Sequence, residues 1–317
     1  MAAASATSDY PRGNGTGGGG WTGADRALLL GLVAFALLRT ASLVFSPLEL
    51  GVDEAQYWLW STGFDFGYYT KPPLTSWIIG LSHGLFGHHE WAVRLPAPWL
   101  HLATSLVLWR AADWLAGPAA GWIAAIIWMT LPSIALGSFV ISTDTPLLLC
   151  WSAGVLALVG VLTGRLRERR GMVLAGGAFG AAMLAKYAAI YGLAGLALFV
   201  LATSVLSRGK DRQKVIGWRG LGLFTLGMVV VASPNILWNL ANELTTVRHL
   251  GDNANLDLRS YSLAGSIGFL AAQFATAGPV VFALMFGILR TRRGDDAGLL
   301  LLCLSAPVIL FIMVQAF

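Results

Sequence analysis

The sequence predicts an all-α polytopic membrane protein with about nine transmembrane helices, and two observations carry this prediction. Of its 317 residues, 56% are hydrophobic and only 12% are charged, whereas about 25% are charged in an average soluble domain. Apolar stretches of about 20 residues, the length that crosses a bilayer core of roughly 30 Å, recur along most of the chain. We expect spans at residues 26–46, 97–116, 118–139, 145–163, 171–186, 188–206, 219–238, 263–289 and 297–317.

The chain before the first span has little apolar surface to bury. Residues 1–25 are rich in glycine, serine and threonine, as in the run GNGTGGGG, and this composition predicts a disordered cytoplasmic tail. A cleavable secretory signal has a short apolar core, but the first apolar run is long enough to cross the bilayer, so we expect it to stay as an anchor. Residues 26–317 then form one transmembrane domain.

The lysines and arginines predict how the chain is threaded, because basic loops resist translocation. With the N-terminus in the cytoplasm, twelve basic residues lie on the inner side, in the loops 164–170, 208–214 and 290–293 and at Arg219, and five lie outside. We therefore expect a multi-pass protein of the plasma (inner) membrane. The net charge of +5 requires no nucleic-acid partner, since the basic residues are spread over the inner loops. A polybasic lipid-binding patch is the alternative.

The segment between the first two spans, residues 47–96, is too long for a simple connection, and loops of this length are usually functional. Its apolar stretch Pro73–Gly87 is too short to cross the bilayer and suits an interfacial helix. In the predicted topology, the acidic residues gathered on the outer side are Asp53, Glu54, Asp65, Glu90, Asp144, Glu243, Asp252 and Asp257. We expect Arg39, the only clear charge within a span, to snorkel or to pair with an outer carboxylate. Because a transporter holds ionisable residues near the membrane midplane, this distribution favours chemistry at the outer face.

Asp53 fits two roles that the residue types alone do not separate. At the start of a short helix it would be the N-cap, with Gln56 three residues later completing a variant of the capping box. It would also serve as a catalytic carboxylate, and the two roles are compatible because a capping carboxylate keeps one oxygen free. Asp144, at the outer start of the fourth span, has the same two interpretations.

Three cations lie at outer span ends or beside them. Lys71 precedes two prolines, so the chain there is extended and stiff and holds the ammonium group in place. A lysine beside tyrosines at the membrane surface is often an interfacial anchor, but with Lys186 and Arg94 it could also form a phosphate-binding site. The adjacent histidines of His88–Glu90 would not face one metal from a helix, so we expect no metal site there.

The run VDEAQYWLWSTGFDFGYYTKPPLTSW at residues 52–77, followed by RLP at 94–96, resembles the first outer loop of the C-type glycosyltransferases that use lipid-linked sugars. The resemblance is to the branch that contains the protein O-mannosyltransferases and the aminoarabinose transferase of lipid A. The segments STDTPLLLCW (142–151), AKYAAIYG (185–192) and SPNILWNLAN (233–242) are similar to later parts of the same branch. The likeness covers residues 26–317.

The resemblance implies that a sugar is taken from a polyprenyl phosphate and passed to an acceptor hydroxyl on the outer side of the membrane. Asp53 would then be the general base at that hydroxyl, and Glu54 would orient the acceptor or the base. Lys71 and Arg94 would hold the lipid phosphate, and Asp144 would support the site.

Two departures from the family pattern leave alternatives open. In the aminoarabinose branch an acidic residue that assists a metal precedes the lysine, but Thr70 stands there in this chain. The need for a divalent cation therefore stays open. Family members also usually continue with further spans, whereas this chain stops in an apolar run at Phe317, so its natural end stays open as well.

The residue types independently fit direct displacement with inversion. One carboxylate can take the proton of the acceptor, and the departing phosphate needs cations more than a proton donor. Aromatic residues such as Tyr57 and Tyr69 would stack on the sugar or the prenyl chain, or belong to the interfacial belt. The expected partners are a polyprenyl-phosphate-linked sugar, an acceptor lipid, glycan or protein, and the bilayer. A lipid-linked-sugar flippase and an inactive membrane scaffold are the alternatives.

Overall fold

The computed structural model describes residues 22–206, 215–246, 248, 264–265, 267–268, 271–272 and 296–316, and every long regular element among them is a helix. The elements are α1 Gly23–Val44, α2 Val52–Ser61, α3 Leu74–Phe86, α4 Glu90–Arg94, α5 Pro96–Ala116, α6 Pro118–Thr130, α7 Pro132–Gly137, α8 Asp144–Leu162, α9 Glu168–Ala185, the short 3-10 helix η1 Tyr187–Ala189, α10 Ile190–Leu206, α11 Trp218–Ala241 and α15 Asp296–Ala316.

Eight of the nine predicted spans coincide with helices of the structure. The span predicted at 263–289 lies, apart from six residues, outside the described part of the chain. Within the described residues, four helical stretches are long and apolar enough to cross a membrane, namely Gly23–Val44, Asp144–Leu162, Tyr187–Leu206 and Trp218–Ala241. The all-helical architecture is therefore confirmed, while the number of nine spans stays a prediction.

The span predicted at 118–139 is divided into α6 and α7 at Pro132, which has no N–H to continue a helix. Arg39 of α1 lies beside this break and is only 5% exposed. Its Nη2 donates to the carbonyl oxygen of Met129 at 2.6 Å, and its Nη1 donates to Oγ of Ser138 at 2.9 Å. The prediction that Arg39 snorkels or pairs with a carboxylate is thus wrong, because this guanidinium satisfies the polar groups that the helix break leaves inside the bundle.

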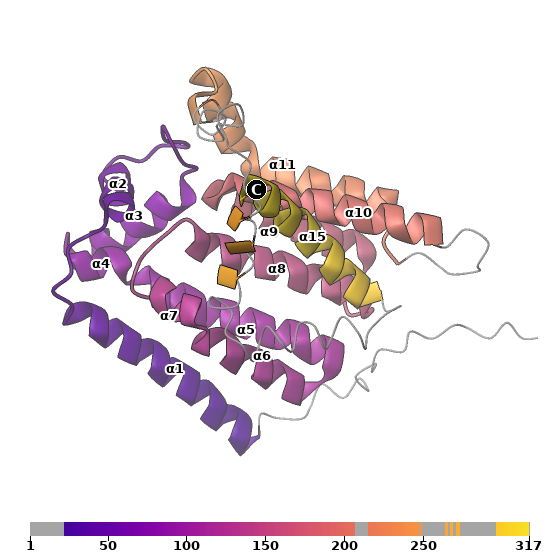
Figure 1. Cartoon of the computed structure of the whole chain (residues 1–317), viewed down its shortest axis with the longest axis horizontal. Coiled ribbons are helices and arrows are strands. Elements are labelled where there is room, and N and C mark those ends of the chain that lie inside the picture. Colours follow the sequence, from indigo (N-terminus) through magenta and orange to yellow (C-terminus); the bar gives the residue numbers. More distant parts are fainter. Residues whose placement is uncertain are drawn as a thin grey trace, which may run out of the picture.

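The long helices lie side by side in a bundle, and the short helices α2, α3 and α4 gather at one end of it, on the left of Figure 1. Within the bundle α9 packs against both α8 and α11, and α5 packs against both α6 and α8. Small residues let α9 and α11 approach closely. A Cβ at Gly180 would lie 2.6 Å from the carbonyl oxygen of Met228, and one at Gly227 would lie 2.8 Å from that of Val173.

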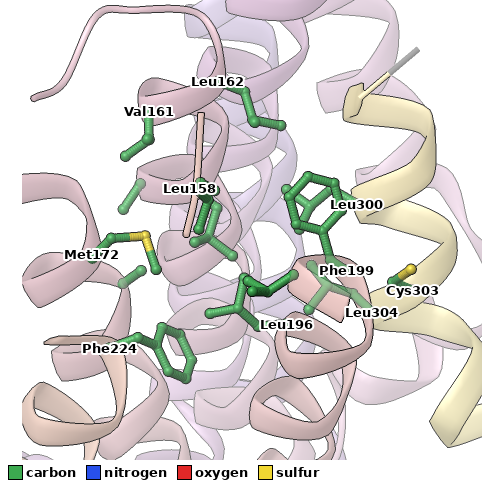
Figure 2. Packing of buried hydrophobic residues seen from close by; sticks show 14 of the residues in the cluster. Leu158, Val161, Leu162, Met172, Leu196, Phe199, Phe224, Leu300, Cys303 and Leu304 are labelled. Carbon is green, nitrogen blue, oxygen red and sulfur yellow. The ribbon is translucent and has the colours of Figure 1, made fainter. Parts of the chain in front are cut away.

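The largest hydrophobic core joins α8, α9, α10, α11 and α15 (Figure 2). Its most buried large side chains include Leu158, Met172, Phe199, Phe224 and Leu300, none more than 2% exposed. A second cluster joins α1, α5 and α6. The first core fixes α8 against α9, and these two helices bring the start of α8 close to the end of α9. Two predicted site residues lie at those positions.

Candidate active site

The helix α2 begins one residue before Asp53, and this changes the role of that carboxylate. Gly51 is the N-cap, and its N–H donates to Oε2 of Glu54 at 2.9 Å. The prediction that Asp53 caps the helix with Gln56 is therefore wrong, since Glu54 provides the side chain that reaches back to the cap. Asp53 is exposed in the first turn of α2. It has no hydrogen bond or ion pair with another described residue, so its carboxylate is available to a ligand.

Glu54 and Arg94 form a buried ion pair beneath Asp53, with 2% and 5% of their surfaces exposed. Nε and Nη2 of Arg94 donate to the two carboxylate oxygens at 2.9 and 2.7 Å. The same guanidinium donates to the carbonyl oxygens of Leu48 and Glu49, and the backbone N–H of Ile141 donates to Oε1 of Glu54. Hydrogen bonding to Glu54 raises the pKa of Arg94. The pair thus ties the loop before α2, α4 and the segment before α8 together.

This geometry does not favour the phosphate-binding role that we predicted for Arg94. Four of the five N–H groups of its guanidinium donate to protein oxygen atoms. The one remaining N–H cannot bind a phosphate through two parallel hydrogen bonds. The carboxylate of Glu54 is likewise occupied on both oxygens. Its predicted role in orienting the base fits this arrangement, because Glu54 holds the turn of helix that carries Asp53.

Tyr57 lies one helical turn after Asp53 and is 2% exposed. Burial raises the pKa of its phenol to about 12, the negative charges of Asp53 and Asp144 contribute to this shift, and a hydrogen bond with Thr143 opposes it. Asp53 lies one helical turn before Tyr57 on α2, and Thr143, which hydrogen-bonds the phenol, directly precedes Asp144. Two carboxylates that are 91 positions apart in the sequence therefore lie on either side of the same phenol. The predicted roles of Tyr57 in stacking on a ligand or in the interfacial belt are wrong, because its ring packs in the core between α2, α3 and α4.

Asp144 and Lys186 form an ion pair where the first residue of α8 lies beside the end of α9. Nζ of Lys186 donates to the two carboxylate oxygens at 2.8 and 3.1 Å, and the side chains of Lys186 and Asp144 are 40% and 51% exposed. Lys186 has an extended backbone between α9 and η1, so the chain turns at this residue. Asp144 is the first residue of α8 and makes no capping hydrogen bond. The structure thus brings a predicted supporting acid and a predicted phosphate ligand together.

Lys71 lies on a loop, residues 62–73, that is docked onto the end of α11. Nδ2 of Asn235 donates to the carbonyl oxygen of Phe66 at 2.8 Å, and Oγ1 of Thr246 donates to that of Tyr68 at 2.7 Å. The N–H of Tyr68 in turn donates to the carbonyl oxygen of Lys71 at 3.2 Å. The ammonium group of Lys71 has no ion pair with another described residue, so the loop presents an available cation.

Gly67 allows this loop to approach α11 closely. A Cβ at this position would overlap the Trp238 indole and lie 2.9 Å from Nδ2 of Asn235. Asn235 also accepts from the Tyr187 hydroxyl at 2.7 Å, and Nδ2 of Asn239 donates to that hydroxyl at 3.0 Å. No role for these two asparagines was predicted from the sequence. Their spacing of four residues inside an apolar helix is the signal that was available, because amides in such a helix need polar partners.

The same loop carries exposed aromatic side chains. Tyr69 is 61% exposed, and Phe64 and Phe66 are 73% and 42% exposed. Phe64 stacks on Trp77 of α3 with ring centroids 5.3 Å apart, and Phe66 meets the same indole edge-on. The stacking and interfacial roles predicted for Tyr69 both remain compatible with its exposure.

The histidines of the HHE run contact different partners. His88 packs against His83, with ring centroids 4.3 Å apart, and accepts from Nε1 of Trp58, whereas His89 stacks on Trp91. In the described ranges, no three His, Cys, Asp or Glu residues lie together as metal ligands. Thr70, which replaces the family acid, has a buried hydroxyl without a hydrogen-bond partner among those residues. A single hydroxyl beside a lysine does not fit a divalent cation, which prefers several carboxylate or carbonyl oxygens.

Solved structures of a known protein share this fold. ArnT from Cupriavidus metallidurans bound to undecaprenyl phosphate superposes with a TM-score of 0.68 and 21% identity, covering 91% of this chain and 56% of that one. The apo form of the same protein gives a TM-score of 0.67 with 92% and 56% coverage. The helical arrangement around α2, α8 and α9 is therefore that of a known membrane-protein fold.

Sequence comparison gives the family. The lipid A galacturonosyltransferase RgtD of Rhizobium johnstonii is 38% identical over 299 residues, which are 92% of this chain and 60% of that protein. The chain thus spans about three-fifths of the length of this curated relative. Residues 70–238, more than half of the chain, match the family described as dolichyl-phosphate-mannose-protein mannosyltransferase. The chain belongs to this family, within the superfamily of C-type glycosyltransferases.

Proposed function

We propose that this protein is a membrane glycosyltransferase that moves a sugar from a polyprenyl phosphate to an acceptor hydroxyl. The observation that carries the proposal is the arrangement around Tyr57, where the available carboxylate of Asp53 and the Asp144–Lys186 pair lie near one phenol. Lys71 adds a second cation on a loop held by α11. A carboxylate for the acceptor and cations for the leaving group are the parts that this reaction needs.

The reaction is a single displacement in this proposal. Asp53 takes the proton of the acceptor hydroxyl as that oxygen attacks the anomeric carbon of the sugar. The bond from this carbon to the phosphate oxygen breaks, and its electron pair leaves with the polyprenyl phosphate. Lys71 and Lys186 stabilise the charge on the departing phosphate, and Asp144 keeps Lys186 in place. Because only one displacement occurs, the anomeric configuration inverts.

The relatives indicate which substrates to test first. The name of RgtD makes lipid A the first acceptor to test, and the ligand of ArnT makes undecaprenyl phosphate the first carrier lipid. The distribution of basic residues, twelve on one side of the predicted topology and five on the other, supports a site on the outer face of the inner membrane with the N-terminus in the cytoplasm.

In proteoliposomes that contain lipid A, we expect transfer of a labelled sugar from undecaprenyl phosphate with release of one undecaprenyl phosphate per sugar transferred. Galacturonic acid is the first sugar to test, because it is the one named for RgtD. Thin-layer chromatography measures the released lipid, and NMR of the product gives its anomeric configuration. Movement of the donor across acceptor-free liposomes without transfer would instead support the flippase, and retention of configuration would contradict a single displacement.

Gly67→Ala should lower the transfer rate by about 10- to 100-fold, because the new methyl group would push the loop of Lys71 away from α11. The matched control is Gly63→Ala in the same loop, where a Cβ would meet nothing within 4 Å. Initial rates at saturating acceptor measure both variants. An equal loss for the two variants, or no loss for Gly67→Ala, would contradict the idea that the fit against Trp238 positions Lys71.

A further inference from the structure

A cavity lies at the opposite end of α8 from Asp144. A helix of 19 residues is roughly 28 Å long at 1.5 Å per residue, and the chain then turns back into α9. The cavity at this turn has a volume of about 680 Å³. It is therefore separate from the proposed catalytic site, and the transfer reaction assigns it no role.

The polar part of this cavity is made of arginines. Arg165, Arg167, Arg169 and Arg170 line it, all four are exposed, and none has an ion pair with another described residue. The neighbouring Glu168 does not line the cavity, and its Oε1 accepts from the N–H of Gly217 before α11. The cavity therefore presents four guanidinium groups with no carboxylate among its lining residues.

The other part of the wall is apolar. Val173 and Leu174, in the second turn of α9, are 44% and 49% exposed and line the same cavity. The guanidinium of Arg165 also lies 5.5 Å from the ring centroid of Trp114 in α5. The chemistry that matches this wall is an amphiphile with a phosphate at one end and a hydrocarbon chain beside it. A soluble anion would leave the apolar part uncovered.

We propose that this cavity binds an anionic phospholipid, with the phosphate on the arginines and an acyl chain along Val173 and Leu174. The end of a helix bundle that crosses a bilayer lies at the depth of the lipid headgroups, where a basic pocket attracts anionic lipid. A basic loop that only fixes the topology needs positive charge and no cavity, and lysine would satisfy it equally. Arginine differs from lysine in that its planar guanidinium can bind two phosphate oxygens at once, which fits a phosphate in this cavity.

The test titrates the delipidated protein with phosphatidylglycerol, phosphatidylcholine or soluble glycerol 3-phosphate and counts bound molecules by native mass spectrometry. We expect phosphatidylglycerol to bind about 10-fold more tightly than phosphatidylcholine, because the four guanidinium groups repel the choline ammonium that lies beside the phosphate in phosphatidylcholine. Glycerol 3-phosphate should bind at least about 10-fold more weakly than phosphatidylglycerol, because it lacks acyl chains. Equal binding of the two lipids, or equal binding of glycerol 3-phosphate, would overturn the proposal.

Variants locate the binding in the cavity. The double variant Arg169→Lys/Arg170→Lys keeps the charge that sets the topology, and we expect it to weaken phosphatidylglycerol binding about 10-fold. The matched control is Arg219→Lys, an exposed arginine in the first turn of α11 that does not line the cavity. It should leave binding unchanged. Full retention of binding in the double variant, or an equal loss in the control, would overturn the assignment.

Discussion

Asp53→Asn should reduce sugar transfer by about 10²- to 10⁴-fold, the range that one general base contributes. An asparagine keeps the shape of the side chain but cannot accept the proton of the acceptor hydroxyl. Asp53 is exposed and makes no hydrogen bond or ion pair within the described ranges, so the variant should keep the stability of the parent within about 0.5 kcal/mol. Initial rates in proteoliposomes and a thermal unfolding curve measure the two effects separately.

The control for this variant is Glu49→Gln, which removes another exposed carboxylate four residues earlier. Transfer by this control should stay within about 2-fold of the parent, since a surface substitution of this kind has little effect. Binding of undecaprenyl phosphate should be the same in all three proteins, because Lys71 and Lys186 are untouched. Unchanged transfer by Asp53→Asn, with its substitution verified, would remove Asp53 from the mechanism and leave Asp144 as the next carboxylate to test.

The helices could be predicted because lipid leaves the backbone few options. A long apolar run must satisfy its polar groups internally, so hydropathy predicts a helix wherever the run is long enough. The same signal does not show where such a run breaks. The division follows from Pro132, which has no N–H, and the polar groups beside it are satisfied by Arg39, which lies about 90 residues earlier in the sequence and binds Met129 and Ser138.

The site could be predicted only in part, because residue types do not show long-range partners. Both Gly51-x-x-Glu54 and Asp53-x-x-Gln56 are readable as helix starts. The first is realised because Arg94, 40 positions away, neutralises Glu54 and makes its burial possible. Arg94 was predicted to be a phosphate ligand because the sequence shows its position near the end of the outer loop but does not show its carboxylate partner.

Arg94→Met should destabilise the protein by about 3–5 kcal/mol, since it leaves the buried carboxylate of Glu54 without its counter-charge. Glu54→Gln should have a smaller effect of the same sign, because the amide still accepts one of the hydrogen bonds from Arg94. Replacing both residues, as Glu54→Gln/Arg94→Met, should recover part of the loss, because the double variant leaves no charge buried. Unfolding in mixed micelles gives the free energy for each variant, and the double-mutant cycle gives the coupling between the two positions.

The exposed pair Arg248–Glu243 provides the matched control, with N and O atoms 3.6 Å apart and side chains 67% and 86% exposed. Arg248→Met should cost no more than about 1 kcal/mol, because water screens a surface ion pair. The experiment also separates two roles for Arg94. If it holds the loop, Arg94→Met lowers stability strongly, and the double variant recovers part of it. If it binds the donor phosphate, stability stays close to the parent and the KM for the polyprenyl-phosphate donor rises. That second result would restore Arg94 to the phosphate site and reduce Glu54 to a cap for α2.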